Sequence, residues 1–233
     1  PVSVYCDDGI PRGLQDADNG KVKYAWILES RFLSQQFVDD IKANLDDYLR
    51  TYELIFTHHK ELLDLHEKFI WCPAYGTYID DIRIYPKTKN CSMIASGKGF
   101  THLHRLRCQI LEKLKVNPLV DVFGRDINPI DRKEDGLCDY RFSIAIENDS
   151  YETYYTEKLL DCFATGTIPL YIGAPDIGDH YDIDGIIPLT STFDFSLLTE
   201  ELYNSKLDHI KNNLEKVREL DVLDDWIYTK YLL

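Results

Sequence analysis

Short apolar runs alternate along the chain with longer stretches in which apolar residues recur every three or four positions. In the first part of the chain the runs are VSVY, KYAWILE, ELIFTH and KFIWCP. Between the second and third runs, apolar residues repeat every four positions at Phe37, Ile41, Leu45 and Leu49, which predicts one helix with a packed face. Strand-length runs that alternate with helices are typical of an α/β protein with largely parallel sheets.

A second series of the same kind begins after the polar segment PKTKN. Its predicted strands are CSMIAS, VDVFG, YRFSIAIE, IPLYIG and IIPL. Helices are expected over about 101–115 and 156–164, and Gly166 stands where the second of them should end. We therefore predict two α/β domains, residues 1–88 and residues 89–233, with a short N-terminal domain.

The composition limits the ligands that this chain can bind. Its 233 residues include 26 Lys and Arg against 40 Asp and Glu, which gives a net charge of −14, and 44% of the residues are hydrophobic. That is enough apolar sequence for packed cores, so disorder is excluded as the main state. An acidic surface repels phosphate, so we expect no nucleic-acid partner and predict that any anionic ligand needs a local basic site.

Several features bear on localisation. No apolar stretch reaches the roughly 20 residues that a membrane span requires, and the N-terminus has no basic-then-apolar leader. The six cysteines are scattered without a C-x-x-C pair, which favours buried thiols in a reducing compartment. We expect a cytoplasmic protein, with peripheral membrane association as the alternative because upstream sequence could carry targeting information.

A basic segment between residues 96 and 115 interrupts the acidic chain. It carries one acid, Glu112, and five basic residues, Lys98, Arg105, Arg107, Lys113 and Lys115. A glycine turn followed by a helix start offers backbone N–H groups and partial positive charge to an anion. Arg105, one turn into the helix, is the favoured contact, whereas the three later cations are expected on a solvated helix face.

Polar residues crowd the chain where the predicted strand YRFSIAIE ends and the next helix begins. Ligands bind at the carboxyl ends of strands in open parallel sheets, and this segment lies at such an end. Thr156 could cap the helix, Lys158 could contact a phosphate, and Glu157 could accept hydrogen bonds from a sugar diol. The alternative is an ordinary helix start with a solvent-facing ion pair.

This region resembles the signature of glycosyltransferase family 10, the α-1,3/1,4-fucosyltransferases. The matching residues are Phe142, Ile146-Glu147-Asn148, Tyr154-Tyr155-Thr156-Glu157-Lys158, Ile168-Pro169 and Gly173. The resemblance implies a GT-B-like fold with two Rossmann-like domains and mainly parallel sheets. It also implies an inverting, metal-independent enzyme without a cofactor, which transfers fucose from a nucleotide-sugar donor, GDP-fucose, to an oligosaccharide or glycoconjugate acceptor.

The resemblance also implies roles for individual donor-binding residues. Lys158 and Arg105 would contact the pyrophosphate, and Glu157 would contact the ribose. Asn148 and Tyr154 would lie on the phosphate or sugar side of the donor. For the position given to Arg105, the alternatives nearby in the chain are His102, His104 and Arg107.

An inverting transfer also needs a base for the acceptor hydroxyl. The resemblance extends to the segment WILES, where Glu29 at the end of a predicted strand is the candidate catalytic residue; the alternative is a surface ion pair with Arg31. Asp182-Ile183-Asp184 spells a D-x-D motif, which we interpret as a solvated loop rather than a metal site.

Two alternatives to a fucosyltransferase stay open at this stage. The first is a glycosyltransferase that uses another nucleotide sugar. The second is a non-catalytic sugar-nucleotide or carbohydrate-binding module, which the short N-terminal half favours because it could lack part of an acceptor site.

Overall fold

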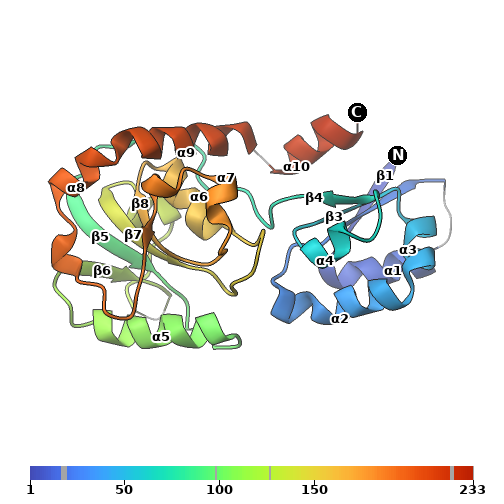
Figure 1. Ribbon diagram of the computed structural model, residues 1–233, viewed down its shortest axis with the longest axis horizontal. Coiled ribbons are helices and arrows are strands. Elements are labelled where there is room, and N and C mark those ends of the chain that lie inside the picture. The colour runs from blue at the N-terminus through green and yellow to red at the C-terminus, as the bar shows by residue number, and fades with distance from the viewer. Residues whose placement is uncertain (17–19, 98, 126, 221–222, 233) are drawn as a thin grey trace. The chain divides into compact units, whose positions relative to one another are not determined.

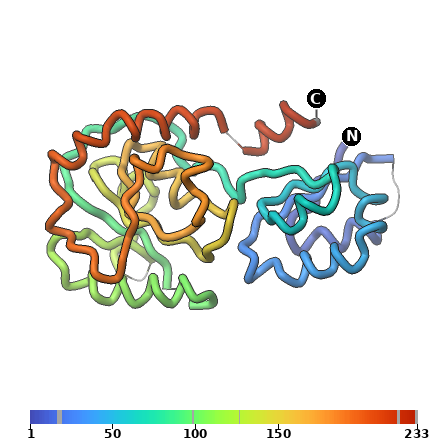
Figure 2. The backbone as a smooth tube through the Cα atoms, viewed as in Figure 1, coloured from blue at the N-terminus to red at the C-terminus, as the bar shows by residue number. Residues whose placement is uncertain are grey.

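The computed structural model describes residues 1–16, 20–97, 99–125, 127–220 and 223–232. The chain forms two compact units. The first unit comprises Pro1–Ala74 and Tyr151–Tyr154, and the second comprises Tyr75–Ser150 and Tyr155–Leu233. The chain therefore passes between the units three times, and its course can be followed in Figure 2.

The first unit is built on a four-stranded parallel sheet whose strands lie in chain order. The strands are β1 (Val2–Cys6), β2 (Val22–Trp26), β3 (Leu54–Thr57) and β4 (Phe69–Trp71). The helices are η1 (Asp7–Gly9), α1 (Ile10–Gln15), α2 (Arg31–Ala43), α3 (Leu45–Thr51) and α4 (Lys60–Leu63). The four strands expected from the apolar runs are confirmed.

The single helix predicted between β2 and β3 is instead two helices. Asn44 ends α2 and begins α3 with a φ of −122° and a ψ of 35°, outside the helical region. Its side-chain Nδ2 donates to the carbonyl oxygen of Asp40 at 3.2 Å. The four-residue repeat continues across this break because both helices pack against the same core, where Ile41 and Tyr48 are fully buried.

The second unit is built on a five-stranded parallel sheet in the order β6-β5-β7-β8-β9. The strands are β5 (Lys89–Ile94), β6 (Val120–Phe123), β7 (Tyr140–Ile146), β8 (Ile168–Ile172) and β9 (Ile187–Pro188). The α-helices are α5 (His102–Leu114), α6 (Glu157–Ala164), α7 (Ile177–His180), α8 (Glu200–Ser205), α9 (Leu207–Leu220) and α10 (Leu223–Ile227). Short 3-10 helices η2 (Lys133–Gly136), η3 (Ile183–Gly185) and η4 (Phe195–Leu197) and a π-helical turn η5 (Tyr228–Leu232) complete the unit.

Helices cover both faces of this sheet, with α5 on one side and α9 on the other (Figure 1). The unit β5-α5-β6 steps toward one edge of the sheet, whereas β7-α6-β8 steps toward the other. The strand order therefore reverses between β5 and β7. In open α/β sheets the crevice at such a reversal, outside the carboxyl ends of the strands, is where ligands bind.

The structure divides the chain at Ala74, whereas the sequence placed the first boundary after residue 88. Residues between these points belong to the second unit because they hydrogen-bond to it. Thr77 Oγ1 donates to Asp161 at 2.8 Å, and the backbone N–H of Arg83 donates to the carbonyl of Ala164 at 3.0 Å. The polar segment that follows joins the start of β5 rather than linking two domains.

Two smaller observations complete the fold. Among the described residues, no helix is both long enough and apolar enough to cross a membrane. None of the six cysteines, all of which lie in the described part of the chain, forms a disulfide, and Cys72, Cys91 and Cys162 are buried as expected.

Candidate functional site

A pocket of about 900 Å³ opens in the second unit where the strand order reverses. Residues at the carboxyl ends of β5 and β7, including Ala95 and Ile146, form part of its wall. Its apolar lining also includes Ile94, Pro129, Ile130, Leu137 and Ile144, and its charged lining includes Arg107, Arg125, Arg132, Lys133, Lys158, Asp131, Glu157 and Asp161. An apolar cavity with a cluster of cations suits a ligand that has both a ring system and negative charge.

Arg107 enters this pocket from α5. The residue is only 4% exposed, and its Nη1 donates to Asn148 Oδ1 at 3.2 Å. His104 Nε2 lies 2.8 Å from the same oxygen and is the donor because the amide oxygen can only accept. Asn148 thus joins the end of β7 to the first turns of α5, and it orients the guanidinium of Arg107.

The start of α5 is held by a reciprocal cap. Thr101 Oγ1 accepts from the backbone N–H of His104 at 3.0 Å, and His104 Nδ1 accepts from the backbone N–H of Thr101 at 3.2 Å. Both side chains are buried. Lys98, which we placed in the glycine turn before this helix, lies outside the described residues.

The structure places Arg105 outside the described lining of the pocket. Arg105 is exposed, its Nη1 donates to the carbonyl of Phe100 at 3.3 Å, and the described residues that line the pocket do not include it. Two residues along a helix correspond to a rotation of about 200°, so Arg105 and Arg107 point to opposite sides. The expectation that Arg107 lies on a solvated face is wrong, because this residue is buried. Lys113 and Lys115 are exposed as predicted.

The first turn of α6 supplies the second basic group of the pocket. Thr156 is the N-cap residue, and both its N–H and its hydroxyl donate to the buried carboxylate of Glu147, at 2.9 and 2.6 Å. Lys158 Nζ donates to Thr156 Oγ1 at 3.0 Å and to Glu157 at 3.2 Å. The alternative of a solvent-facing ion pair does not fit, because the side chains of Lys158 and Glu157 are only 24% and 14% exposed.

Lys133 adds a cation that the sequence did not predict. Its Nζ lies 2.8 Å from Asp161 and 3.6 Å from Glu157, and it stands over the ring of Tyr78 at 4.7 Å. Burial opposes ionisation of Glu157, but the nearby ammonium groups of Lys158 and Lys133 outweigh it and lower the pKa of this carboxyl. Glu157 is therefore ionised at neutral pH and can accept hydrogen bonds.

Tyr154 belongs to the first unit rather than to the pocket. It is 1% exposed, and its ring centroid lies 4.8 Å from that of Tyr151 and 5.1 Å from that of His58. The described lining of the pocket does not include it. The middle part of the motif, residues 151–154, thus belongs to the first unit, whereas the parts before and after it belong to the second.

Glu29 also lies in the first unit, just beyond the end of β2, and is partly exposed. Its backbone N–H donates to Asp7 Oδ1 at 3.2 Å, and its carbonyl oxygen lies 3.2 Å from His58 Nε2. Arg31, the suggested ion-pair partner of Glu29, pairs with Glu61 at 3.1 Å.

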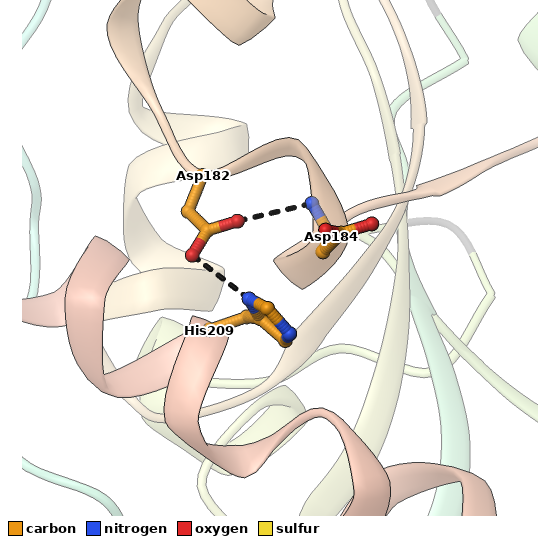
Figure 3. A group of neighbouring side chains, drawn as sticks. All are labelled: Asp182, Asp184 and His209. Carbon is orange, nitrogen blue, oxygen red and sulfur yellow. Dashed lines mark hydrogen bonds and ion pairs between the residues drawn. The ribbon is translucent and has the colours of Figure 1, made fainter.

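The D-x-D motif lies against α9 (Figure 3). Ligand atoms of Asp182, Asp184 and His209 lie within 4.8 Å of one another. However, Asp182 Oδ1 accepts from the backbone N–H of Asp184 at 3.2 Å, and its Oδ2 accepts from His209 at 2.9 Å and from Asn212 at 2.9 Å. Both oxygens are therefore used to cap η3 and to join it to α9, which supports a structural role.

From the sequence, Arg107 was named only as an alternative to Arg105, and Lys133 was missed. Leu103, Arg107, Leu111 and Leu114 are all buried on α5, so Arg107 stands within the apolar stripe of that helix, a signal that was present in the sequence. A charged residue at a buried stripe position needs a polar partner and is a candidate for function. Lys133 follows no periodic pattern, and only the tertiary structure places this first residue of η2 beside Asp161 on α6.

Comparisons with known proteins agree with this picture. Residues 84–215, more than half of the chain, match the family model "Glycosyltransferase family 10 (fucosyltransferase) C-term". A fucosyltransferase-like protein of Arabidopsis thaliana is 34% identical over 98 residues, which are 40% of this chain and 19% of the relative. The α-(1,3)-fucosyltransferase FucT of Helicobacter pylori is 27% identical over 84 residues, 36% of this chain and 17% of the relative. The chain thus matches less than a fifth of the length of either relative.

A solved structure supports the fold. The crystal structure of TarM aligns with 97% of this chain and 54% of its own, with a TM-score of 0.59 and 10% identity. Together with the two parallel sheets, this similarity confirms the prediction of a GT-B-like fold.

Proposed function

Because this chain belongs to glycosyltransferase family 10 (fucosyltransferase), we propose that it transfers fucose from GDP-fucose to a hydroxyl group of an oligosaccharide or glycoconjugate. The names of the two relatives support this class of reaction. The H. pylori relative is an α-(1,3)-fucosyltransferase, which makes the 1,3 linkage the first one to test.

The observation that carries the proposal is the convergence of Arg107 and Lys158 on one pocket at the reversal of strand order. Arg107 lies in the second turn of α5 and Lys158 in the first turn of α6, and these helices follow the adjacent strands β5 and β7. Two cations that come from helices on opposite faces of the sheet and line one pocket can hold the oxygens of a diphosphate. Glu157, ionised and in the same lining, would accept hydrogen bonds from the ribose hydroxyls.

The same cations support a metal-independent reaction. When the bond between the sugar C1 and the diphosphate oxygen breaks, the electron pair leaves with the diphosphate, whose negative charge increases. Positive side chains that are already oriented stabilise this charge without rearrangement. Arg107 is oriented by Asn148, and Lys158 is oriented by Thr156 and Glu157.

Inversion follows if the acceptor oxygen attacks C1 from the face opposite to the diphosphate. The acceptor hydroxyl then loses its proton while the new C–O bond forms, and a carboxylate must take that proton. We assign this role to Glu29. Its partly exposed position beyond the end of a parallel strand supports the assignment.

The test is transfer from GDP-fucose to a panel of glycan acceptors in the presence of excess EDTA. We expect product of inverted anomeric configuration in wild type, strongly reduced transfer and GDP binding in Lys158→Met, and loss of transfer with retained GDP binding in Glu29→Gln. Lys113→Met, an exposed lysine on α5, is the matched control. Activity that is lost in EDTA and restored by Mg²⁺ or Mn²⁺ would overturn metal independence, and full activity of both variants would overturn the site.

The donor is tested separately by melting temperature with GDP, UDP, ADP and CMP. A ligand that binds only the folded state raises the melting temperature. We expect the largest rise with GDP. A larger rise with another nucleotide would indicate a different donor sugar, and GDP binding without turnover on any acceptor would indicate a non-catalytic binding module.

A further inference from the structure

The peptide backbone of Glu29 is held from both sides within the first unit. On one side, Asp7 Oδ1 accepts from the backbone N–H groups of Leu28 at 2.9 Å and of Glu29 at 3.2 Å. On the other side, His58 Nε2 lies 3.2 Å from the carbonyl oxygen of Glu29. The segment after β2 is therefore bound by a residue that follows β1 and by one that follows β3, the two neighbours of β2 in the sheet.

The contact with His58 defines the tautomer of this ring. A carbonyl oxygen can only accept, so Nε2 carries the proton and Nδ1 does not. His58 is fully buried, and burial together with the neighbouring His59 lowers the pKa of His58 to about 3, so the ring is neutral. The unprotonated Nδ1 can then accept from the hydroxyl of Tyr151, which lies 3.4 Å away.

Tyr151 continues the same chain of hydrogen bonds to the start of α2. Its hydroxyl oxygen accepts from the backbone N–H of Arg31 at 2.8 Å. The segment from Leu28 to Arg31, with Glu29 inside it, is thus bound at both ends and in the middle. Thr153, from the same short segment as Tyr151, donates its hydroxyl to the carbonyl oxygen of His58 and helps to hold this residue.

Asp7 makes its hydrogen bonds to Leu28 and Glu29 from an unfavourable backbone conformation. Asp7 has a φ of +41°, in the left-handed region that residues other than glycine seldom occupy. Such a conformation costs roughly 1 to 2 kcal/mol, and Asp tolerates it better than most residues. The side chain makes the two hydrogen bonds to Leu28 and Glu29 from this position.

We propose that Asp7 and His58 are positioning residues, which hold the backbone of Glu29 so that its carboxylate faces the acceptor hydroxyl. Tyr151 supports them by holding the ring of His58. This inference rests on the proposed function, with Glu29 as the base. Asp7, His58 and Tyr151 contact neither donor nor acceptor in this proposal, so they should affect the rate of transfer and leave GDP binding unchanged.

The first test separates backbone strain from hydrogen bonding at Asp7. Asp7→Gly accepts the positive φ but removes the side chain, whereas Asp7→Asn keeps an oxygen that can accept from both N–H groups. Because a displacement of about 1 Å can cost about a hundredfold in rate, we expect the kcat of transfer to fall at least about tenfold in Asp7→Gly. The KM for the acceptor should stay near the wild-type value, and Asp7→Asn should keep most of the activity.

The second test uses the donor role of His58 Nε2. His58→Phe keeps a ring but cannot donate, and we expect a similar fall in kcat. His58→Gln carries an amide N–H that can reach the same carbonyl, so it should restore part of the lost rate. Tyr48→Phe is the control, because it removes a buried hydroxyl bonded to Asp40 in the same unit, away from Glu29.

GDP affinity, melting temperature and slow hydrolysis of the donor in the absence of acceptor are measured on every variant. Equal loss of kcat in Asp7→Gly and Asp7→Asn and in His58→Phe and His58→Gln, or a loss of kcat that simply follows melting temperature, would overturn the positioning role. Glu29→Gln separates the two proposals: if it keeps full transfer activity, then the base assignment has failed. If it is inactive while Asp7→Gly and His58→Phe are fully active, only the positioning role has failed.

Discussion

Arg107 on α5 and Asn148 beyond the end of β7 are joined by a hydrogen bond of 3.2 Å between Nη1 and Oδ1. The same amide oxygen accepts from His104, so one uncharged side chain orients a buried cation and the helix that carries it. Asn148 is therefore expected to act on the donor through Arg107, a more specific role than the contact that we predicted from the sequence.

This relationship predicts a clear difference between two arginines on one helix. Arg107→Ala removes a buried charge from the pocket, and we expect GDP affinity to fall by about tenfold to a hundredfold, since a hydrogen bond to a charged group contributes about 1.5 to 3 kcal/mol. Arg105→Ala should leave the affinity within about twofold of wild type. Calorimetric titration with GDP measures both, and the reverse order would return the diphosphate contact to Arg105.

Lys133 is expected to contribute to both stability and donor binding. Lys133→Met keeps an aliphatic side chain but removes the ammonium group that stands over the ring of Tyr78, and it leaves the buried carboxylate of Asp161 without its ammonium partner. We expect a lower melting temperature and weaker GDP binding, because an uncompensated buried charge is costly. Exposed Lys113→Met provides the control. An unchanged melting temperature together with unchanged GDP affinity would show that Lys133 is dispensable.

The end of α6 depends on a glycine. Gly166 has a φ of +70°, and a Cβ built there would lie 2.9 Å from the Cα of Ile84. Gly166→Ala should therefore lower stability by about 1 to 3 kcal/mol, through backbone strain and through the displacement of the segment that contains Ile84. Gly9→Ala is the control, since nothing lies within 4 Å of its Cβ position. Chemical denaturation that shows equal stability of the two variants would contradict this account.

Acid should destabilise the first unit through its two buried histidines. Burial lowers the pKa of His58 to about 3 and that of His59 to about 4, well below the usual value of 6.5. Above pH 6.5 both are neutral in the folded and unfolded states. As the pH falls from 6.5 toward 4, only the unfolded state binds these protons, so stability is lost.

The size of this acid effect can be measured by variants. Each histidine can raise the unfolding equilibrium constant by up to about tenfold per pH unit in that window. His58→Gln should flatten the pH dependence of denaturant unfolding between pH 6.5 and 4, while the control Tyr48→Phe lowers stability about equally at all these pH values. If His58→Gln leaves the slope unchanged, the ring is not neutral in the folded protein.

The D-x-D motif should respond as a structural cap. Asp182→Ala removes the acceptor for Asp184 N–H, His209 and Asn212, and we expect a stability loss of about 1 to 2 kcal/mol with unchanged GDP affinity. Asp184→Ala, whose side chain is exposed, should have little effect. A rise in wild-type melting temperature with Mn²⁺ that disappears in Asp182→Ala would instead reveal a metal site.

The order of elements and the position of the segment proposed to bind the donor could be predicted from the sequence for a physical reason. Parallel strands buried on both faces are continuous apolar runs, and a helix start carries its cap within a few residues, as Thr156, Glu157 and Lys158 do. These patterns involve residues that are close in the chain, so they can be recognised without knowledge of the fold. The break at Asn44 was missed because the apolar repeat continues through it.

Contacts between residues far apart in the chain were decided by the tertiary structure alone. Arg107 rather than Arg105 lines the pocket because the sheet lies against one face of α5, and a repeat of 3.6 residues puts the two arginines on opposite faces. Lys133 reaches Asp161, and Tyr151 reaches Arg31 across 120 positions, only through folding. Local chemistry thus determined which segments could bind a sugar nucleotide, while long-range packing decided which side chains meet and which backbone is held in place.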